Sequence, residues 1–243
     1  MATNNRIIDA HAMLGVENHL AMEVDELLRR MDVYGIEAAV ARPMGAELVI
    51  DFVAGNDRLL STPNRIFAWV TANPWAGVRA LDELERCRDR GAVGLFLHPA
   101  RQGFMPTEPM VVPLLEQATN FNWPVMFHTG TYVNADVLAV VELARRYPSV
   151  AFVAGFGGFA DMWFEMPGAM AEVENLYLDL SMTWSAEIKQ ITTGSGADRV
   201  LYGSAEPRNR YPVTLRALDR LDLEGPQRQA ILCDNVRRIL KLP

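Results

Sequence analysis

The sequence predicts a single, compact (β/α)8 barrel of the TIM type that spans residues 1–243. Eight short apolar runs alternate with amphipathic helical patterns, and such runs are typical of parallel strands covered on both faces. A chain of 243 residues is short but sufficient for eight β/α units. A doubly wound open sheet is the alternative, but no GxGxxG motif follows the first run, which disfavours it.

The strand-like runs and the helical patterns follow one another in order along the chain. Strands are expected at residues 6–11, 37–41, 66–70, 93–97, 124–128, 150–154, 176–180 and 199–203. Helices are expected at residues 24–34, 46–60, 78–90, 110–121, 135–146, 186–192, 213–221 and 227–240. In the first helix Leu27, Leu28 and Met31 share one side, and Gly35 stands where a helix commonly ends. No linker, repeat or low-complexity segment interrupts this order, so we expect one domain.

The composition is that of a soluble globular protein, with 50% hydrophobic and 22% charged residues. A net charge of −7 disfavours nucleic acid and anionic membranes as partners, because both would repel the chain. No run approaches the roughly 20 apolar residues of a membrane span, and residues 1–6 lack the apolar segment of a secretory signal. Cys87 and Cys233 have no second cysteine or histidine nearby, which predicts two reduced, buried thiols and a cytoplasmic location.

Histidines and carboxylates stand at the ends of the apolar runs, where a barrel of this type carries its chemistry. His11 ends the first run, His98 the fourth and His128 the fifth, and Glu206 follows the eighth. Asp9 precedes His11 by two residues, so on a strand the two side chains share a face. The sequence therefore predicts a candidate site at the carboxyl ends of the strands.

Five segments at these strand ends resemble, in chain order, the metal-dependent hydrolases and decarboxylases of the amidohydrolase-related family. Ile8-Asp9-Ala10-His11-Ala12-Met13-Leu14-Gly15 resembles I-D-x-H-x-H-x-G, and Val93-Gly94-Leu95-Phe96-Leu97-His98-Pro99 is similar to G-x-K-L-H-P. Residues 124–130 resemble P-V-x-x-H-x-G, residues 152–158 a segment with H-x-G-G, and residues 200–207 G-S-D-x-P. Residues 235–240 are similar to the closing helix. The resemblance covers nearly the whole chain and implies a barrel with a metal site.

Four positions depart from the pattern that the resemblance implies. Met13 stands at the second histidine of H-x-H, Phe96 at the lysine, Phe156 at the histidine of the sixth run, and Ala205 at the aspartate. Of the implied ligands, His11 and His128 remain, whereas catalytic zinc usually has three protein ligands. Ala205 can neither orient nor deprotonate a water molecule. We therefore expect an eroded metal site filled by apolar side chains and no standard hydrolytic cycle.

A single zinc ion stays open as an alternative, because His11 and His128 with Glu206 or Asp9 form a chemically reasonable ligand set. Each of these residues also has a structural interpretation. Asp9 and Asp179 can accept hydrogen bonds within the barrel, Glu206 can pair with Arg208 or Arg210, and His98 can be a satisfied turn histidine.

The favoured function is that of a subunit of a heteromeric metal-dependent enzyme, with a structural or regulatory role. The expected partner is a larger amidohydrolase-like chain, a second copy of this chain, or both. The two-chain hydroxylase (a monooxygenase) that acts on 2-aminoisobutyrate is one setting that the resemblance suggests. Residues 156–167, rich in aromatic residues and methionine, are expected to form either a core-facing helix or a docking surface.

Two other functions remain open. One is a mononuclear zinc-dependent hydrolase or decarboxylase with a remodelled ligand set, in which Glu206 is the candidate catalytic residue. The other is a metal-free protein that binds a small carboxylate through Arg42 or Arg101. Hydrophobic closure of the barrel mouth favours the subunit, and a wet pocket lined by His11, His128 and Glu206 favours the enzyme.

Overall fold

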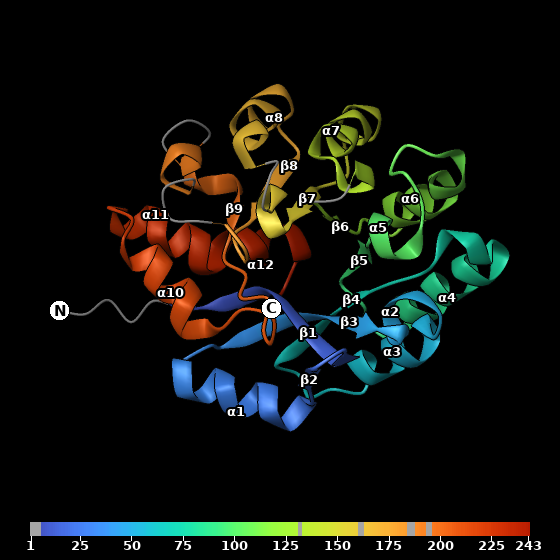
Figure 1. Ribbon diagram of the computed structural model, residues 1–243, viewed down its shortest axis with the longest axis horizontal. Coiled ribbons are helices and arrows are strands. Elements are labelled where there is room, and N and C mark those ends of the chain that lie inside the picture. The colour runs from blue at the N-terminus through green and yellow to red at the C-terminus, as the bar shows by residue number, and fades with distance from the viewer. Residues whose placement is uncertain (1–5, 131–132, 160–162, 184–187, 193–195) are drawn as a thin grey trace.

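The computed structural model describes residues 6–130, 133–159, 163–183, 188–192 and 196–243. Their strands form one curled sheet in the order β2-β1-β3-β4-β5-β6-β7-β8-β9, with helices around it (Figure 1). The parallel strands are β1 (Ile8–Glu17), β3 (Ala38–Gly45), β4 (Ile66–Val70), β5 (Gly94–Leu97), β6 (Val125–His128), β7 (Phe152–Gly155), β8 (Leu176–Asp179) and β9 (Val200–Leu201). Each of the eight predicted runs overlaps one of these strands, and β1 and β3 extend beyond the predicted ends.

Backbone hydrogen bonds between the first and last parallel strands close the sheet into a barrel. The amide of Ala10 donates to the carbonyl of Tyr202 at 2.8 Å, and the amide of Ala205 donates to the carbonyl of His11 at 2.7 Å. The ninth strand, β2 (Leu20–Met22), pairs antiparallel with the end of β1 in a hairpin that the sequence analysis did not predict. The predicted eight-stranded barrel is confirmed.

The helices largely follow the predicted ranges. They are α1 (Val24–Tyr34), α2 (Ala46–Val49), α3 (Phe52–Leu60), α4 (Val78–Asp89), α5 (Pro99–Gln102), α6 (Val112–Asn120), α7 (Val137–Arg146), α8 (Met166–Glu172), α10 (Tyr211–Asp219), α11 (Gly225–Gln229) and α12 (Asn235–Leu240). Gly35 ends α1 in the left-handed conformation, with its φ at 67°. The predicted helix 46–60 is interrupted because the side-chain amide of Asn73 binds the carbonyl of Val49 at 3.0 Å.

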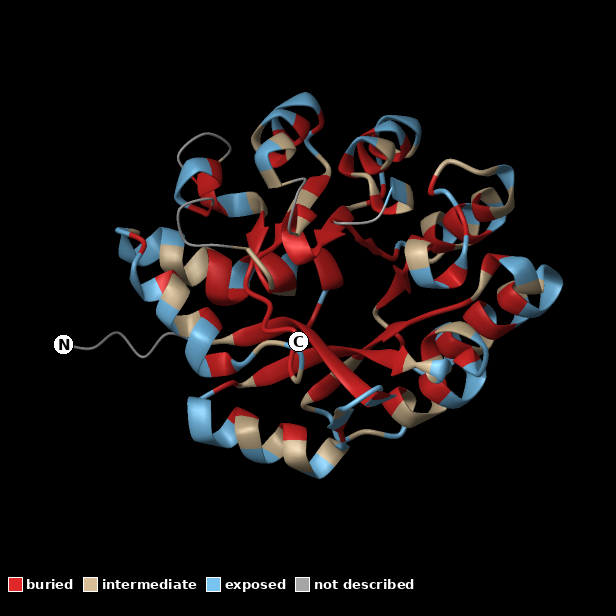
Figure 2. Cartoon of the chain, viewed as in Figure 1, coloured by how far each residue is buried: buried red, intermediate tan, exposed pale blue. Residues whose placement is uncertain are grey.

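The barrel has two layers of hydrophobic packing, and the strands that separate them are buried (Figure 2). Alternate strand residues, among them Val40, Trp69 and Phe96, fill the interior together with residues of α12. A larger cluster lies between the sheet and the surrounding helices. Cys87 and Cys233 are buried and form no disulfide, as expected. No helix in the described part of the chain is long and apolar enough to cross a membrane.

Two predicted segments fall partly outside the described residues. Residues 188–192 are helical, whereas 186 and 187 lie outside the described ranges. In the segment 156–167, Phe156 and Met166 are buried, Phe164 is exposed, and residues 160–162 are not described. The described part of this segment holds short turns at 156–158 and 163–165 and the start of α8, and the alternatives of a core-facing helix and a docking surface stay predictions.

Candidate functional site at the barrel mouth

A buried hydrogen-bond chain links three strands at the mouth of the barrel. His11 of β1 is fully buried, and its Nδ1 lies 2.6 Å from a carboxylate oxygen of Asp179, the last residue of β8. Arg42 of β3 donates from Nε to Nε2 of the same ring at 2.9 Å. A guanidinium N–H can only donate, so Nε2 must be the acceptor and the ring proton must reside on Nδ1. Arg42 thereby fixes the tautomer of His11.

The charge states of these three groups are consistent with that assignment. Burial lowers the pKa of Arg42 to about 9, so the guanidinium stays protonated at neutral pH. Burial also lowers the pKa of His11, against the opposing effect of Asp179, and keeps the imidazole neutral. Burial alone would raise the pKa of Asp179, but His11, the Phe156 amide and Ser181 lower it below its ordinary value. The hydrogen-bond chain therefore consists of a protonated Arg42, a neutral His11 ring and an ionised Asp179.

Two aromatic rings enclose the guanidinium and the imidazole. The Arg42 Cζ lies 4.5 Å from the centroid of the Phe96 ring and 5.8 Å from that of Phe156, within the range of cation–π attraction. Phe156 also stacks on His11 with 4.8 Å between centroids. Its backbone adopts a φ of 64°, a conformation in which bulky residues are rarely found. Met13 is fully buried and belongs to the same large hydrophobic cluster as Phe156.

Asp9 is fully buried, and both of its carboxylate oxygens bind donors of the chain itself. It accepts hydrogen bonds from the His11 amide (3.0 Å), the Ser204 amide (2.8 Å), the Ser204 hydroxyl (2.5 Å) and the Tyr211 hydroxyl (3.0 Å). Burial raises the pKa of Asp9 to about 6, while these donors act in the opposite direction. Hydrogen bonding within the barrel is one interpretation of Asp9 in the sequence analysis, and these bonds join β1 to the segment after β9.

Glu206 does not join the histidines. Its carboxylate accepts from Arg30 Nη1 of α1 at 2.5 Å and from the Tyr211 amide at 3.2 Å. An ion pair was expected, but with Arg208 or Arg210 rather than with Arg30. Ala205, which precedes it, is buried with a positive φ of 54° and donates its amide to the His11 carbonyl. Gly203 is required nearby, because a Cβ there would lie 2.0 Å from an Asp179 oxygen.

His98 and His128 form a stacked pair on the other side of Phe156. Their ring centroids are 3.8 Å apart, and the Phe156 ring meets His128 edge-on at 4.6 Å. Burial lowers the pKa of both rings well below the ordinary value, and nearby arginines act in the same direction. Among the described residues, no atom forms a hydrogen bond with Nδ1 of His98. His98 is therefore not the satisfied turn histidine that the sequence suggested.

An ionic cluster spans the mouth above these buried rings. Glu17, at the end of β1, accepts from Arg101 Nη2 at 2.6 Å, and the same oxygen pairs with Arg208. Arg101 lies in α5 after β5 and Arg208 follows β9, so the cluster links opposite sides of the barrel. Sequence reasoning missed Glu17, because no local motif indicates a carboxylate whose partners lie 84 and 191 residues away. His11, Arg42 and His98 are each at most 3% exposed beneath it.

The described residues at the barrel mouth do not fit a metal ion. Both ring nitrogens of His11 are engaged, one by Asp179 and the other by Arg42, and Asp9 is saturated by protein donors. Within the described ranges, no three His, Cys, Asp or Glu side chains come together closely enough to hold a cation. A protonated guanidinium in contact with His11 also disfavours a second positive charge there.

A family model for amidohydrolases, Amidohydro_2, matches residues 8–242. The chain belongs to the amidohydrolase family. Solved structures agree with this fold at low sequence identity. A manganese-bound 5-carboxyvanillate decarboxylase from Novosphingobium aromaticivorans has a TM-score of 0.82 at 14% identity, covering 98% of this chain and 96% of that one.

Two further decarboxylases have the same architecture. The 5-carboxyvanillate decarboxylase of Sphingomonas paucimobilis has a TM-score of 0.79 at 14% identity, covering 98% of this chain and 99% of that one. The 2,6-dihydroxybenzoate decarboxylase of Rhizobium has a TM-score of 0.75 at 16% identity, with 98% of each chain covered. No curated protein matches the sequence significantly. At these identities the likeness establishes the fold of this amidohydrolase-family chain.

Proposed function

We propose that this amidohydrolase-family chain does not activate water at a metal, and that it is a subunit of a complex with a catalytic relative. The hydrogen bond from Arg42 Nε to His11 Nε2 carries the proposal. It places a buried, protonated guanidinium on the nitrogen through which His11 would otherwise bind a metal. A hydrolytic site of the usual kind needs an open coordination position for water. In this chain the side chain of Arg42 occupies the space beside His11 Nε2, and the rings of Phe96 and Phe156 lie near its guanidinium.

An arc of exposed apolar side chains on the barrel rim supports the association with a partner. The rim arc comprises Ile50, Trp75, Met105 and Val133, from the loops after β3, β4, β5 and β6. Ile50, Trp75 and Val133 are 75%, 65% and 86% exposed. Exposed aromatic residues and methionine are enriched at protein interfaces.

Hydrogen bonds join the neighbouring loops that carry the rim arc. Asn73 binds the Val49 carbonyl at 3.0 Å, which brings Ile50 towards the loop of Trp75. The Trp75 indole donates to the Gly103 carbonyl at 3.1 Å. Asn134 donates to the Phe104 carbonyl at 3.3 Å, which holds Val133 beside Met105. Four consecutive loops therefore present apolar side chains along one side of the mouth.

Metal analysis tests the first half of the proposal. We expect untagged protein, incubated with Zn²⁺ or Mn²⁺ and then desalted, to retain less than about 0.2 metal per chain, because the described residues form no three-ligand site. Elemental analysis by mass spectrometry gives the number. Retention of one metal per chain, lost in His11→Ala, would contradict the proposal.

Co-purification tests the second half. We expect the chain to co-elute in size exclusion with an amidohydrolase-family relative expressed from the same genome, and the Ile50→Ser/Trp75→Ser double variant to elute alone. Leu138→Ser is the matched control, because Leu138 is exposed on α7 outside the rim arc. Wild-type chain that elutes without such a relative at micromolar concentration, or a double variant that still co-elutes, would remove the subunit role.

A metal-dependent decarboxylase is the second candidate, and the comparisons favour it. The similar solved structures include decarboxylases of aromatic acids, among them manganese-bound examples. For this chain, His11 and His128 are the two candidate ligands that lie near the same phenylalanine ring. The second candidate predicts carbon dioxide release from a hydroxybenzoate together with stoichiometric metal. The subunit role predicts neither carbon dioxide release nor stoichiometric metal from the isolated chain.

A further inference from the structure

A hollow of about 610 Å³ lies along α10, on the outer side of the loops that follow β7, β8 and β9. Its apolar walls are Phe159, Met182, Pro212, Val213 and Ala217. Its volume falls within the roughly 300–1,000 Å³ typical of small-molecule sites. None of these five side chains belongs to the hydrogen-bond chain of His11, although Arg208 of the ionic cluster at the mouth also lines the hollow.

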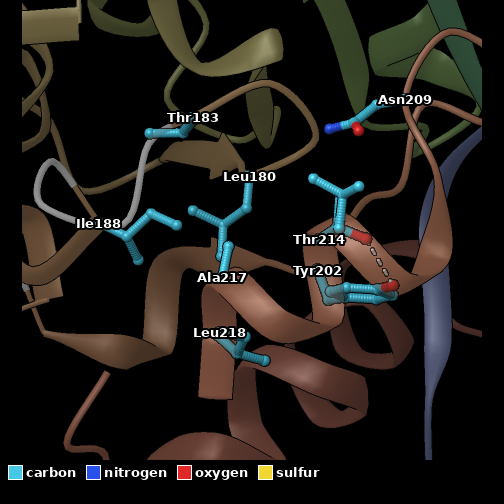
Figure 3. A pocket seen from close by; sticks show the side chains of 9 residues that line it. Leu180, Thr183, Ile188, Tyr202, Asn209, Thr214, Ala217 and Leu218 are labelled. Atoms are coloured by element: carbon cyan, nitrogen blue, oxygen red, sulfur yellow. Dashed lines mark hydrogen bonds between the residues drawn. The ribbon is translucent and has the colours of Figure 1, made fainter. Parts of the chain in front are cut away.

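A narrow apolar slot continues the hollow into the protein. Thr183, Asn209, Val213 and Ala217 line both spaces, and the slot adds about 40 Å³. Figure 3 shows Leu180, Ile188 and Leu218 around this slot, with the Tyr202 hydroxyl bound to Thr214 beside it. That hydrogen bond pairs the two hydroxyls, and Thr183 Oγ1 in the same slot has no partner among the described residues, so the slot offers a ligand apolar contacts and one open hydroxyl.

Cations line the same hollow. Arg208, Arg216 and Arg220 contribute to its wall, and Arg208 is paired with Glu17. Within the described ranges, neither Arg216 nor Arg220 has a carboxylate or carbonyl partner for its guanidinium. Most described arginines of this acidic chain do have such partners, whereas the guanidinium groups of Arg216 and Arg220 beside the apolar hollow are open to an anionic ligand.

We propose that the hollow binds a small amphipathic monocarboxylate, such as a medium-chain or aryl acid. Arg216 lies on α10 and Arg220 is the residue that ends this helix, four positions further on, a spacing that puts both side chains on one face. Both guanidinium groups can then bind one carboxylate, which accepts such paired hydrogen bonds well. The tail of the acid covers Val213 and Ala217 and reaches the slot. This proposal is independent of the role proposed for the barrel centre.

Calorimetric titration with sodium octanoate tests the proposal on the full chain. We expect saturable binding with a dissociation constant below about 1 mM, which is modest for a ligand of this size. Acetate lacks the tail and octylamine reverses the charge, so each is expected to bind at least about tenfold more weakly. The Arg216→Gln/Arg220→Gln variant is expected to lose at least about tenfold in affinity for octanoate.

The controls separate this site from non-specific binding. Arg79→Gln removes an exposed arginine on α4, and it is expected to leave octanoate binding unchanged. Ala217→Trp fills the hollow and is expected to abolish binding, with folding checked by circular dichroism. If Ala217→Trp does not fold, the arginine double variant decides. Absence of octanoate binding, equal binding of octylamine, or unchanged binding by the double variant would each overturn the proposal.

Discussion

Replacing Asp179 with asparagine is expected to lower the free energy of unfolding by about 3–5 kcal/mol, the range for breaking a buried charged pair. Asp179 accepts from His11 Nδ1 (2.6 Å), the Phe156 amide (3.0 Å) and both the amide and the hydroxyl of Ser181 (3.0 and 2.7 Å). An asparagine side chain would turn its NH2 group towards some of these donors. The buried Arg42 cation would also lose a nearby carboxylate.

Urea denaturation of Asp179→Asn, with an unchanged slope against denaturant, measures this loss. Asp89→Asn is the matched control, because Asp89 is an exposed residue at the end of α4 and pairs there with Arg88. The control is expected to change stability by no more than about 0.5 kcal/mol. A loss below about 1 kcal/mol in Asp179→Asn would show that the hydrogen-bond chain contributes little to the fold.

The barrel could be predicted because strand and helix periodicities are local properties of the sequence. All eight apolar runs became strands, since each is followed by an amphipathic stretch that covers it. The break after Val49 could not be predicted, because its cause is a hydrogen bond from Asn73, 24 residues further along the chain. The β1–β2 hairpin was missed because it is short, and only three residues of β2 pair with β1.

The candidate site was predictable in its location but not in its connections. His11 and His128 were expected at strand ends; His128 ends β6, whereas His11 lies within β1, which continues to Glu17, and both rings lie near one phenylalanine ring. Arg42 was expected only as a partner for an anion, whereas its Nε binds His11. A sequence does not indicate which buried acceptor a long side chain will reach. For the same reason Arg30 was not foreseen as the partner of Glu206, 176 residues away.

Stability is expected to fall by about 2–3 kcal/mol between pH 7 and pH 5.5, because the chain buries neutral histidines. His98 and His128 have pKa values lowered well below 6.5 by burial, and that of His11 is lowered too. Between the folded pKa and 6.5 the unfolded chain binds more protons, so acidification favours unfolding. Asp9 opposes this effect. Its pKa is raised to about 6, so the folded chain takes up that proton more readily below this pH.

Urea titrations at several pH values measure the slope of stability against pH, which separates titration from simple loss of packing. His98→Gln is expected to reduce the fall between pH 7 and 5.5 by about 1 kcal/mol, whatever its effect on stability at pH 7. His19→Gln is the matched control for the loss of a histidine, since His19 lies exposed in the turn between β1 and β2. Constant stability across this range, or a His98→Gln curve parallel to that of the wild type, would contradict a barrel mouth that holds its histidines neutral.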